Sequence, residues 1–548
     1  MKLEIRMLTC MDKVFLDEAP QASEPVYQGF QNERIDFQVA FRAQDTRWTE
    51  VEVHLHGPLQ AYARVRQVMH VPVRYAMPEE EKESCLRYAP GLYPDLLSEI
   101  RPHALHASPR WSCLWVRLEP PEAHFAPGEY PLSIAFRDGE GNAYAAPETR
   151  ILILPGLLPP QKLIHTKWFH CDGLCQYYGV EPFSERHWEI IGNFMRCAVQ
   201  GGINMILMPV HTPPLDTREG GQRLVTQLAD IALEGNEYRF DLSRVRRWIA
   251  LCKACGVEYY EIAHLFTQWG AFHAPCVMAT VNGEYRQLFG WDTDAAGEAY
   301  GRFLQSYIPA LRACFAEEGI EKNVFWHISD EPSREQMKSY AAARGQAEKL
   351  LTGCQVIDAQ SDLDFYRQGL IAHPIPANDR IAPFLEAKVP DLWTYYCCGQ
   401  THRVSNMFIA LPSYRNRILG TQLFKFGIKG FLQWGFNFYN SCLSDYPIDP
   451  YQTTDADGWV PAGDPFQVYP GPGGMPEESI RMAVTFQALQ DLRALELLSS
   501  LIGRENVIRM IDEGLSSPVT FSEYPQSNAY LLSLRKRINA EIASRLQA

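Results

Sequence analysis

The chain has 548 residues, of which 46% are hydrophobic and 12% are aromatic. Its length exceeds what one hydrophobic core usually organises, so we expect two or three domains, and its composition excludes a mainly disordered chain. The formal net charge is −14, from 51 Lys and Arg against 65 Asp and Glu. This balance excludes a nucleic-acid partner, because such a partner would need a basic face.

The apolar segments are short throughout the sequence. The longest wholly apolar stretches, such as residues 151–154, cannot cross a bilayer. Glu4 and Arg6 interrupt the region where a signal peptide needs an apolar segment. We therefore expect a soluble, cytoplasmic protein without a membrane partner, and we expect its 14 cysteines to be reduced.

Residues 1–158 have the pattern of a β-sandwich. Apolar and polar residues alternate over 35–41 and over 132–136, and the second run leads into an Asp-Gly-Glu-Gly-Asn turn at 138–142. Several short alternating strands separated by Pro and Gly turns are typical of two packed antiparallel sheets.

A linker at 152–161, with three prolines and one glycine, leads into a region with a different pattern. Beyond it, short apolar strands alternate with amphipathic helices, such as those predicted over 185–200 and 241–255. Eight strand candidates follow in order: 162–170, 203–211, 257–266, 323–332, 354–362, 370–379, 391–399 and 429–440. Eight alternating β and α units are typical of a (β/α)8 barrel.

We therefore predict an α/β fold with an all-β N-terminal domain. A β-sandwich over 1–158 precedes a (β/α)8 TIM-type barrel over 159–500, and a C-terminal helical segment over 501–548 packs on the barrel. Cys252 and Cys255 lie on the apolar face of the 241–255 helix. We interpret them as core thiols rather than as metal ligands, because no second Cys-x-x-Cys pair completes a four-ligand site.

The active site of such a barrel lies at the carboxyl ends of its strands. The residues found there are carboxylates, histidines and large aromatics: His170, His211, His264, Asp330, Glu331, Asp358, Tyr395, Tyr396 and Trp434. Sugar rings stack on aromatic faces and need polar partners for their hydroxyl groups, so this mixture favours a carbohydrate. A dinucleotide is disfavoured, because no GxGxxG motif follows a strand, and we expect no cofactor.

Asp330 and Glu331 are adjacent at the end of the fourth strand and precede Pro332. Neighbouring residues inside a strand point to opposite faces, but at a strand end broken by proline both side chains can turn toward one pocket. Two carboxyl groups in one desolvated site titrate apart, leaving one as an acid and one as an anion. The alternative interpretation is a helix N-terminus, because Asp-Glu-Pro-Ser also supplies capping residues.

The sequence resembles glycoside hydrolase family 123 in several segments. They are GLYPDLL at 91–97, RWSCLWVRLEPP at 110–121, APGEYPLSI at 126–134, ISDEP at 328–332, a segment at 416–439 and another at 463–495. The resemblance implies a retaining β-N-acetylgalactosaminidase in which the 2-acetamido oxygen of the substrate attacks the anomeric carbon. Asp330 would orient the acetamido N–H and stabilise the developing positive charge, while Glu331 would act as general acid and then as general base.

Other residues are predicted to bind the sugar. Trp434 would form the platform under the ring, and one of Tyr395 and Tyr396 would reach the acetamido group while the other packs against a helix. His211 and His264 would bind sugar hydroxyl groups, with a structural role as the alternative for each. Further contacts are predicted from Trp168 and Asn437 at the rim and from Asp464, whose alternative role is to hold its loop.

Three other functions stay open. A conventional retaining glycosidase would pair Glu331 with a second carboxylate, Glu261 or Asp358. A metal-dependent hydrolase would use His170, His211 and His264, but these histidines form no recognisable ligand set, so we expect no metal. A carbohydrate-binding relative without turnover is disfavoured by the intact acidic pair. The expected partner is an oligosaccharide or a glycoconjugate glycan. N-acetylgalactosamine is preferred to N-acetylglucosamine by the resemblance only. The sequence does not determine the oligomeric state, and a homodimer is one alternative.

Overall fold

The computed structural model describes residues 2–45 and 48–547. The chain forms two compact units, and each contains more than one segment of the sequence. Unit 1 comprises Met1–Gln161, Arg403–Lys425 and Glu477–Ala548, and unit 2 comprises Lys162–His402 and Phe426–Pro476. The domain limits expected from the sequence, at residues 158 and 500, stay a prediction.

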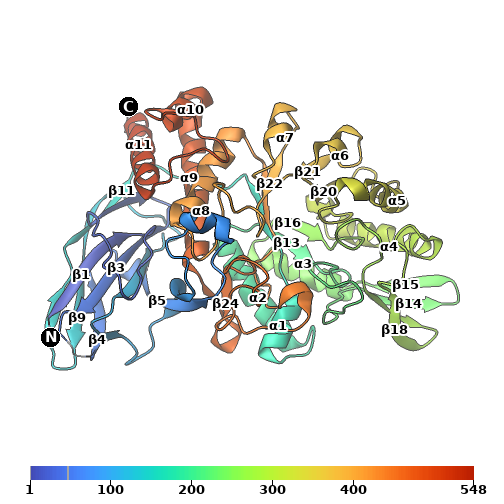
Figure 1. Ribbon diagram of the computed structural model, residues 1–548, viewed down its shortest axis with the longest axis horizontal. Helices are drawn as coiled ribbons and strands as arrows, with labels where there is room; N and C mark the ends of the chain where they lie inside the picture. The colour runs from blue at the N-terminus through green and yellow to red at the C-terminus, as the bar shows by residue number, and fades with distance from the viewer. Residues whose placement is uncertain (1, 46–47, 548) are drawn as a thin grey trace. The chain divides into compact units, whose positions relative to one another are not determined.

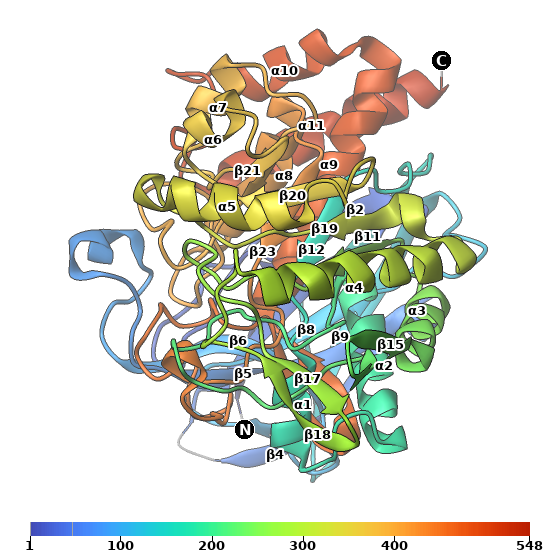
Figure 2. The same ribbon diagram turned by 90° about the vertical axis from the view of Figure 1, so that its right-hand side faces the viewer.

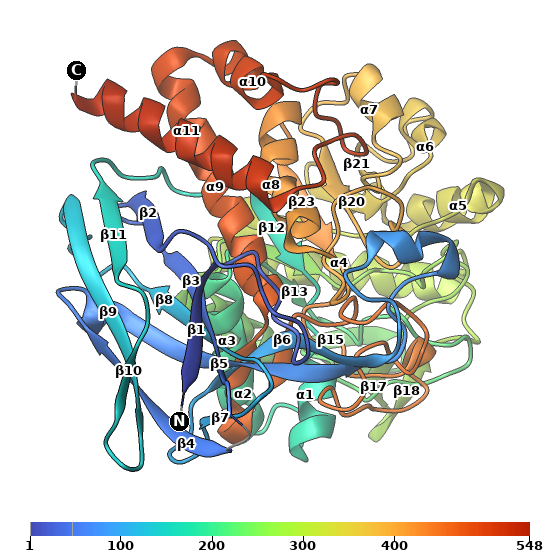
Figure 3. The ribbon, with the colours of Figure 1, turned by 60° about the vertical axis from the view of Figure 1, so that its left-hand side comes forward.

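Unit 1 contains the predicted β-sandwich (Figure 3). One sheet has the order β1-β3-β8-β5-β6 and the other has the order β2-β11-β9-β4-β7, with β10 paired to β9. The strands are β1 (Leu3–Thr9), β2 (Val26–Phe30), β3 (Ile35–Ala43), β4 (Thr49–His56), β5 (Ala63–Val73), β6 (Gly91–Glu99), β7 (His106–Ala107), β8 (Ser112–Leu118), β9 (Gly128–Asp138), β10 (Ala143–Ala145) and β11 (Thr149–Leu154). The alternating side chains Phe37, Val39 and Phe41 of β3 and Ile134 and Phe136 of β9 are buried in one core, as the period of two predicts.

Four helices belong to the same unit: α8 (Ser413–Phe426, whose last residue lies in unit 2), α9 (Ile480–Ile502), α10 (Arg504–Asp512) and α11 (Asn528–Gln547). Ser479 caps α9, because its side chain accepts a hydrogen bond from the Met482 N–H. Helices α10 and α11 both contact α9. Helices α10 and α11 lie in unit 1, and the packing of the predicted C-terminal helical segment on the barrel stays a prediction.

Unit 2 contains a barrel of eight parallel strands, which confirms the predicted TIM-type fold (Figure 1). The strands are β12 (Ile164–Lys167), β13 (Met205–Met208), β16 (Tyr259–Ile262), β19 (Val324–Trp326), β20 (Gln355–Ala359), β21 (His373–Ile375), β22 (Trp393–Tyr395) and β23 (Gly430–Gln433). They pair in chain order, and β23 returns to pair with β12. A parallel bridge between Ala377 and Tyr395 joins the chain after β21 to β22, so the ring of strands is nearly closed. All eight strand candidates of the sequence are barrel strands.

Helices follow most of these strands: α1 (Cys171–Tyr178), α2 (Glu185–Gln200), α3 (Ser243–Cys255), α4 (Glu298–Glu317), α5 (Met337–Ala347), α6 (Leu363–Arg367) and α7 (Ala382–Glu386). Figure 2 shows α4 and α5 side by side in front of the barrel strands. Helix α3 ends at Gly256, which adopts the left-handed conformation. Cys252 and Cys255 are buried free thiols, as predicted.

The loops after β13 and β16 contain a four-stranded sheet that the sequence analysis did not predict. Its order is β15-β14-β17-β18, with strands β14 (Asp230–Glu234), β15 (Glu237–Asp241), β17 (Val277–Val281) and β18 (Glu284–Phe289). Two further short strands, β24 (Val468–Pro470) and β25 (Pro476–Glu478), follow β23. Within the described part of the chain, none of the helices combines the length and the apolar composition that crossing a membrane requires.

Candidate active site

A cavity lies at the carboxyl ends of the barrel strands. Its walls come from the ends of five strands and from the loops after β13, β16, β22 and β23. The lining residues are Trp168, Asp216, Gln268, Trp269, Asp330, Glu331, Ala359, Tyr395, Cys397, Cys398, Leu432, Trp434, Trp459 and Val460.

Asp330 and Glu331 both line this cavity, and the backbone at the end of β19 explains how neighbours in the chain can do so. The carbonyl oxygen of Asp330 accepts a hydrogen bond from the Trp269 N–H (2.9 Å), on the side of β16. The N–H of Glu331 donates to the carbonyl of Ala359 (3.2 Å), on the side of β20. Glu331 adopts a left-handed conformation with φ of 44°. The strand geometry that would send the two side chains to opposite faces is therefore interrupted between them, at the cost of local backbone strain.

Each of the two carboxyl groups has its own partner. The Gln268 side chain donates from Nε2 to Oδ2 of Asp330 at 3.0 Å. The hydroxyl group of Tyr395 donates to Oε1 of Glu331 in a short hydrogen bond. The two side chains are therefore held from different parts of the barrel, the loop after β16 and the end of β22, although they are adjacent in sequence.

Burial raises the pKa of both carboxyl groups. The charge of Glu331 raises the pKa of Asp330 further, while Gln268 and the positive charge of His327 lower it. The hydrogen bond from Tyr395 lowers the pKa of Glu331. Because two charged carboxyl groups this close repel each other in a dry cavity, the pair retains a proton at a pH where isolated carboxyl groups would both be ionised.

A network of buried hydrogen bonds lies in the barrel next to this pair and is centred on His327. Its Nε2 contacts Oε1 of Glu261 at 2.6 Å, and its Nδ1 contacts Oδ1 of Asp358 at 3.2 Å. Tyr340 donates to the other oxygen of Asp358 at 2.6 Å. Trp168, which lines the cavity, donates from Nε1 to Glu261 at 2.8 Å. Burial lowers the pKa of His327, but the hydrogen bonds that it donates to Asp358 and Glu261, together with their negative charges, outweigh this effect and raise the pKa to about 9. His327 is therefore an imidazolium at neutral pH.

The charge on His327 predicts a pH-dependent stability. Because its pKa is higher in the folded chain than in the unfolded chain, its contribution is complete below about pH 6.5 and is lost as the pH rises through about 9. We expect His327→Gln to lower the free energy of unfolding by about 3 kcal/mol near pH 6. We expect the difference in thermal unfolding midpoint between the wild type and this variant to become smaller toward pH 9.5. His56→Gln, an exposed position on β4, should show no such narrowing, and a pH-independent gap for His327→Gln would contradict the prediction.

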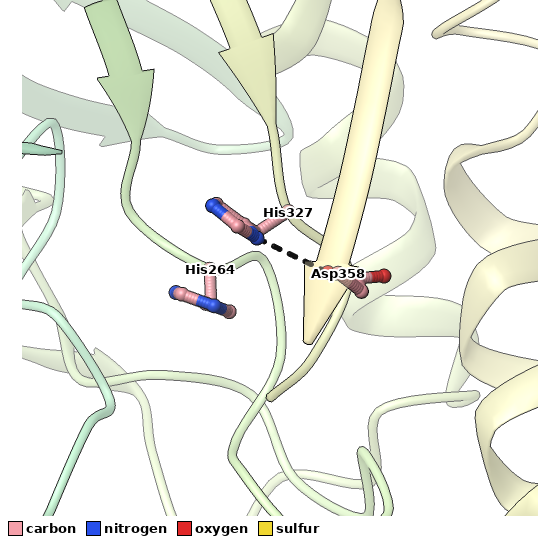
Figure 4. A group of neighbouring side chains, drawn as sticks. All are labelled: His264, His327 and Asp358. Atoms are coloured by element: carbon pink, nitrogen blue, oxygen red, sulfur yellow. Dashed lines mark hydrogen bonds and ion pairs between the residues drawn. The ribbon is translucent and has the colours of Figure 1, made fainter. Parts of the chain in front are cut away.

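His264, His327 and Asp358 are the one group among the described residues whose ligand atoms lie close enough to share a metal ion, within 4.8 Å of one another (Figure 4). Their geometry does not suit coordination. The two imidazole rings stack with centroids 4.1 Å apart and planes 18° from parallel, so their in-plane lone pairs do not converge on one point. Both nitrogens of His327 also already contact carboxylates. His327 and Asp358 belong to a hydrogen-bond network, whereas His264 joins them by ring stacking alone, with no hydrogen-bond partner for its ring nitrogens among the described residues.

Aromatic side chains form much of the cavity wall. Trp434 is anchored by a hydrogen bond from its Nε1 to Oδ2 of Asp464, at 2.7 Å. Trp459 packs against Trp434 edge to face, with ring centroids 5.9 Å apart. Trp168 is held through Glu261. Asp464 therefore holds an aromatic residue and is not itself among the lining residues.

Four residues that were expected at the sugar lie outside the described cavity lining. Tyr396 packs edge to face on Phe431, so of the two adjacent tyrosines Tyr395 faces the cavity. His211 contacts the carbonyl of His264 at 2.8 Å. Asn437 makes two hydrogen bonds to the backbone of His170, at 2.9 and 3.0 Å. His264 stacks on His327. The geometry of these four residues is that of structural side chains.

The alternative carboxylates and metal ligands also occupy other places. Glu261 and Asp358 are fully buried against His327 and do not line the described cavity. His170 contacts the Trp434 carbonyl at 3.0 Å and the Arg223 side chain at 3.1 Å, so it is not grouped with His211 and His264.

Several lining residues were missed by the sequence analysis. Asp216, Gln268 and Trp269 lie in loops after the second and third barrel strands, and Trp459 lies in the long loop after the eighth. One signal was available for all four, because loops that follow the strands of such a barrel face the active-site end. Nothing in the sequence indicated which residues of these long loops would reach the cavity.

A profile described as Glycoside hydrolase 123, catalytic domain, matches residues 168–498, which is more than half of the chain. The chain belongs to glycoside hydrolase family 123. Among solved structures, a family 123 glycoside hydrolase from Clostridium perfringens, studied for glycolipid glycan hydrolysis, has a TM-score of 0.77 at 13% sequence identity, and the match covers 99% of this chain and 98% of that chain.

Two further structures are similar to smaller degrees. A β-glucuronidase from Parabacteroides merdae has a TM-score of 0.29 at 11% identity, covering 83% of this chain and 49% of that chain. A family 20 exo-β-N-acetylglucosaminidase from Vibrio harveyi has a TM-score of 0.24 at 8% identity, and the match covers 100% of this chain and 99% of that chain. No curated protein matches the sequence.

The family membership makes the chain a glycoside hydrolase. The cavity of this family 123 glycoside hydrolase has three carboxyl groups on its wall, from Asp216, Asp330 and Glu331. Hydrolysis of a glycosidic bond requires proton transfer to the leaving oxygen, and carboxyl groups with raised pKa values are suited to that transfer.

Proposed function

We propose that this glycoside hydrolase removes a terminal β-linked N-acetylgalactosamine from an oligosaccharide or a glycoconjugate glycan, with retention of configuration. The observation that carries the proposal is the pair Asp330 and Glu331, which are adjacent in sequence and line one cavity. Ordinary retaining glycosidases place two carboxyl groups on opposite faces of the sugar, about 5 Å apart, and adjacent residues cannot easily straddle a ring. A route in which the substrate supplies the nucleophile is therefore favoured.

In this route the 2-acetamido oxygen attacks the anomeric carbon and forms a new C–O bond, while the glycosidic C–O bond breaks. Glu331 gives its proton to the leaving oxygen. Asp330 accepts a hydrogen bond from the acetamido N–H and stabilises the positive charge that develops on the resulting oxazolinium. Water then attacks the anomeric carbon, Glu331 takes its proton, and the acetamido oxygen leaves. Two inversions at one carbon retain the configuration.

The surroundings of the pair agree with these roles. Burial and the charge of Glu331 favour a neutral Asp330, whereas Gln268 and His327 favour its negative charge. An acetamido N–H would favour that charge further when the sugar binds, and we propose that Glu331 then holds the proton of the pair. Tyr395, which contacts Glu331, is the candidate partner of the acetamido group, and the anchored Trp434 is the candidate platform under the ring. The glycan of a glycolipid, the substrate class in the Clostridium perfringens study, is one candidate substrate.

Two nitrophenyl glycosides test the proposal. We expect release of nitrophenol from the β-N-acetylgalactosaminide and little release from the β-galactoside, because only the first carries the acetamido nucleophile. Equal rates on both substrates would overturn the substrate-assisted route and would make Asp216 the candidate for a second carboxylate. If neither glycoside releases nitrophenol but the protein still binds N-acetylgalactosamine, the protein would be a carbohydrate-binding protein without turnover.

A further inference from the structure

We propose that Asp216 binds a ring hydroxyl group of the sugar in the cavity, and that it does so as a neutral carboxyl group. The inference rests on the proposed function, because it takes the ligand of the cavity to be an N-acetylhexosamine. It adds a residue to the site that lies more than 100 positions before the acidic pair in the sequence.

The first observation is an unused hydrogen-bonding atom. Asp216 lines the cavity and is 7% exposed, and its Oδ2 is buried without a hydrogen-bond partner among the described residues. Buried carboxyl oxygens are almost always hydrogen-bonded, so an unpaired one on a cavity wall indicates a missing partner. A sugar hydroxyl group supplies both a donor and an acceptor.

The second observation is that Asp216 has a left-handed backbone. Its φ is 48°, in a region that residues other than glycine adopt uncommonly and that Asp and Asn tolerate best. The Ser444 hydroxyl donates to the Asp216 carbonyl at 2.7 Å, and the Asp216 N–H donates to Oε1 of Gln268 in a short hydrogen bond. A conformation of this kind persists only where the surroundings over-determine the backbone, and it is frequent at functional sites.

The third observation connects Asp216 to Asp330. One side chain, Gln268, accepts from the Asp216 backbone and donates to Oδ2 of Asp330. The position of Asp216 relative to the acidic pair is therefore set by a single amide group. A residue placed in this way can contact the same sugar ring whose acetamido group Asp330 is proposed to bind.

The charges around Asp216 favour its neutral form. Burial raises its pKa, the guanidinium of Arg223 lowers it, the charge of Glu331 raises it and the Gln268 side chain lowers it, with a result of about 7. Asp330 also faces Asp216, and the charge of Asp216 raises the pKa of Asp330. The thiol of Cys442, in the long loop after β23, is a further titratable group near Asp216. Arg223 is itself occupied by an ion pair with Asp172 at 2.7 Å. Arg223 therefore divides its attraction between Asp172 and Asp216.

A sugar entering the cavity displaces the water that solvates a charged carboxyl group. The ionised form of Asp216 then becomes more costly, because in the proposed function Asp330 binds the acetamido group as an anion in the same dry space. Binding of the sugar is consequently linked to binding of a proton by Asp216 above neutral pH. The neutral carboxyl donates its O–H to a hydroxyl oxygen and accepts from a hydroxyl hydrogen.

The test measures binding of the product sugar, N-acetylgalactosamine, by calorimetry in the Glu331→Gln background, where the general acid no longer titrates. This substitution also removes a charge that raises the pKa of Asp216, so the midpoint lies somewhat below 7. We expect the affinity to fall at least about 10-fold between about pH 5.5 and about pH 8.5. In the double variant Asp216→Asn, Glu331→Gln we expect no fall, because a carboxamide does not ionise. Asparagine tolerates the left-handed backbone, so this variant should fold.

Asp445→Asn in the same background is the matched control. Asp445 is a nearby acidic residue that is bound to the exposed Arg218, and the pH-dependent fall should persist there. A fall that persists in the Asp216→Asn double variant would assign the titration to Asp330 and overturn the inference. A flat profile in the Glu331→Gln parent would overturn it as well. If the profile is flat but the wild-type protein hydrolyses the nitrophenyl β-N-acetylgalactosaminide, the proposed function stands and only the role of Asp216 is refuted. If the profile is flat and the wild-type protein does not hydrolyse this glycoside, the proposed function is refuted as well.

Discussion

The Glu331→Gln variant should cleave an N-acetylgalactosamine-containing disaccharide about 10²- to 10⁴-fold more slowly than the wild type, the range typical for loss of a general acid. The glutamine amide cannot give a proton to a sugar alkoxide, which is a poor leaving group without it. Glu331 has the environment of such an acid, because burial raises its pKa and Tyr395 fixes its position. Chromatography of the released sugar measures the rate.

A dinitrophenyl glycoside separates the two roles proposed for Glu331. Dinitrophenolate leaves without protonation, so the first step should stay fast in Glu331→Gln, while hydrolysis of the intermediate still lacks its general base. A burst of dinitrophenol followed by a slow phase is therefore expected. Glu335→Gln, at an exposed glutamate four residues further along, should behave as the wild type. A wild-type rate of Glu331→Gln on the disaccharide would show that the acidic pair acts only as a helix cap.

The Asp330→Asn variant should reduce kcat/KM on the nitrophenyl β-N-acetylgalactosaminide about 10²- to 10³-fold, the effect typical of losing one preorganised charge at a reacting centre. The asparagine side chain has the same shape and still faces Gln268, but it cannot stabilise the positive charge of the oxazolinium. Initial rates over a pH series measure this loss together with a shift in the pH profile.

The shift has a predictable sign. Glu331 must be protonated for the first step, so kcat/KM falls as the pH rises through its pKa. The charges of Asp330 and Glu331 repel each other, so removing the Asp330 charge lowers the pKa of Glu331. The alkaline limb of the profile should therefore move to lower pH in Asp330→Asn. Asp292→Asn, exposed and outside the cavity lining, is the control, and an unchanged profile in Asp330→Asn would argue against a shared proton.

The architecture could be predicted from the sequence because its signals are local. The alternation of Phe37, Val39 and Phe41 is a property of one strand, and it places these side chains in the sandwich core whatever the neighbouring strands are. The eight apolar runs of the barrel are likewise readable one by one. Asp330 and Glu331 could be singled out because they end such a run and precede a proline, a pattern contained within ten residues.

The remaining features depended on register and on long-range packing. Whether Tyr395 or Tyr396 faces the cavity is decided by the pairing of β22 with its neighbours, since a shift of one residue exchanges the two faces. His211 and Asn437 stand at strand ends, as the cavity residues do, yet their polar atoms are taken up by the backbones of His264 and His170. The sequence does not contain those distances.

The sequence by itself determined the sandwich, the barrel and the acidic pair, because hydrophobic periodicity and strand ends are set by neighbouring residues. Only the tertiary structure decided the surroundings of that pair. It brought Asp216, Gln268 and Trp269 to the cavity from loops that carry no periodic pattern, it turned Glu331 through a left-handed backbone, and it placed the charged His327 between two carboxylates. These features arise from contacts between segments far apart in the chain, which no local pattern of side chains encodes.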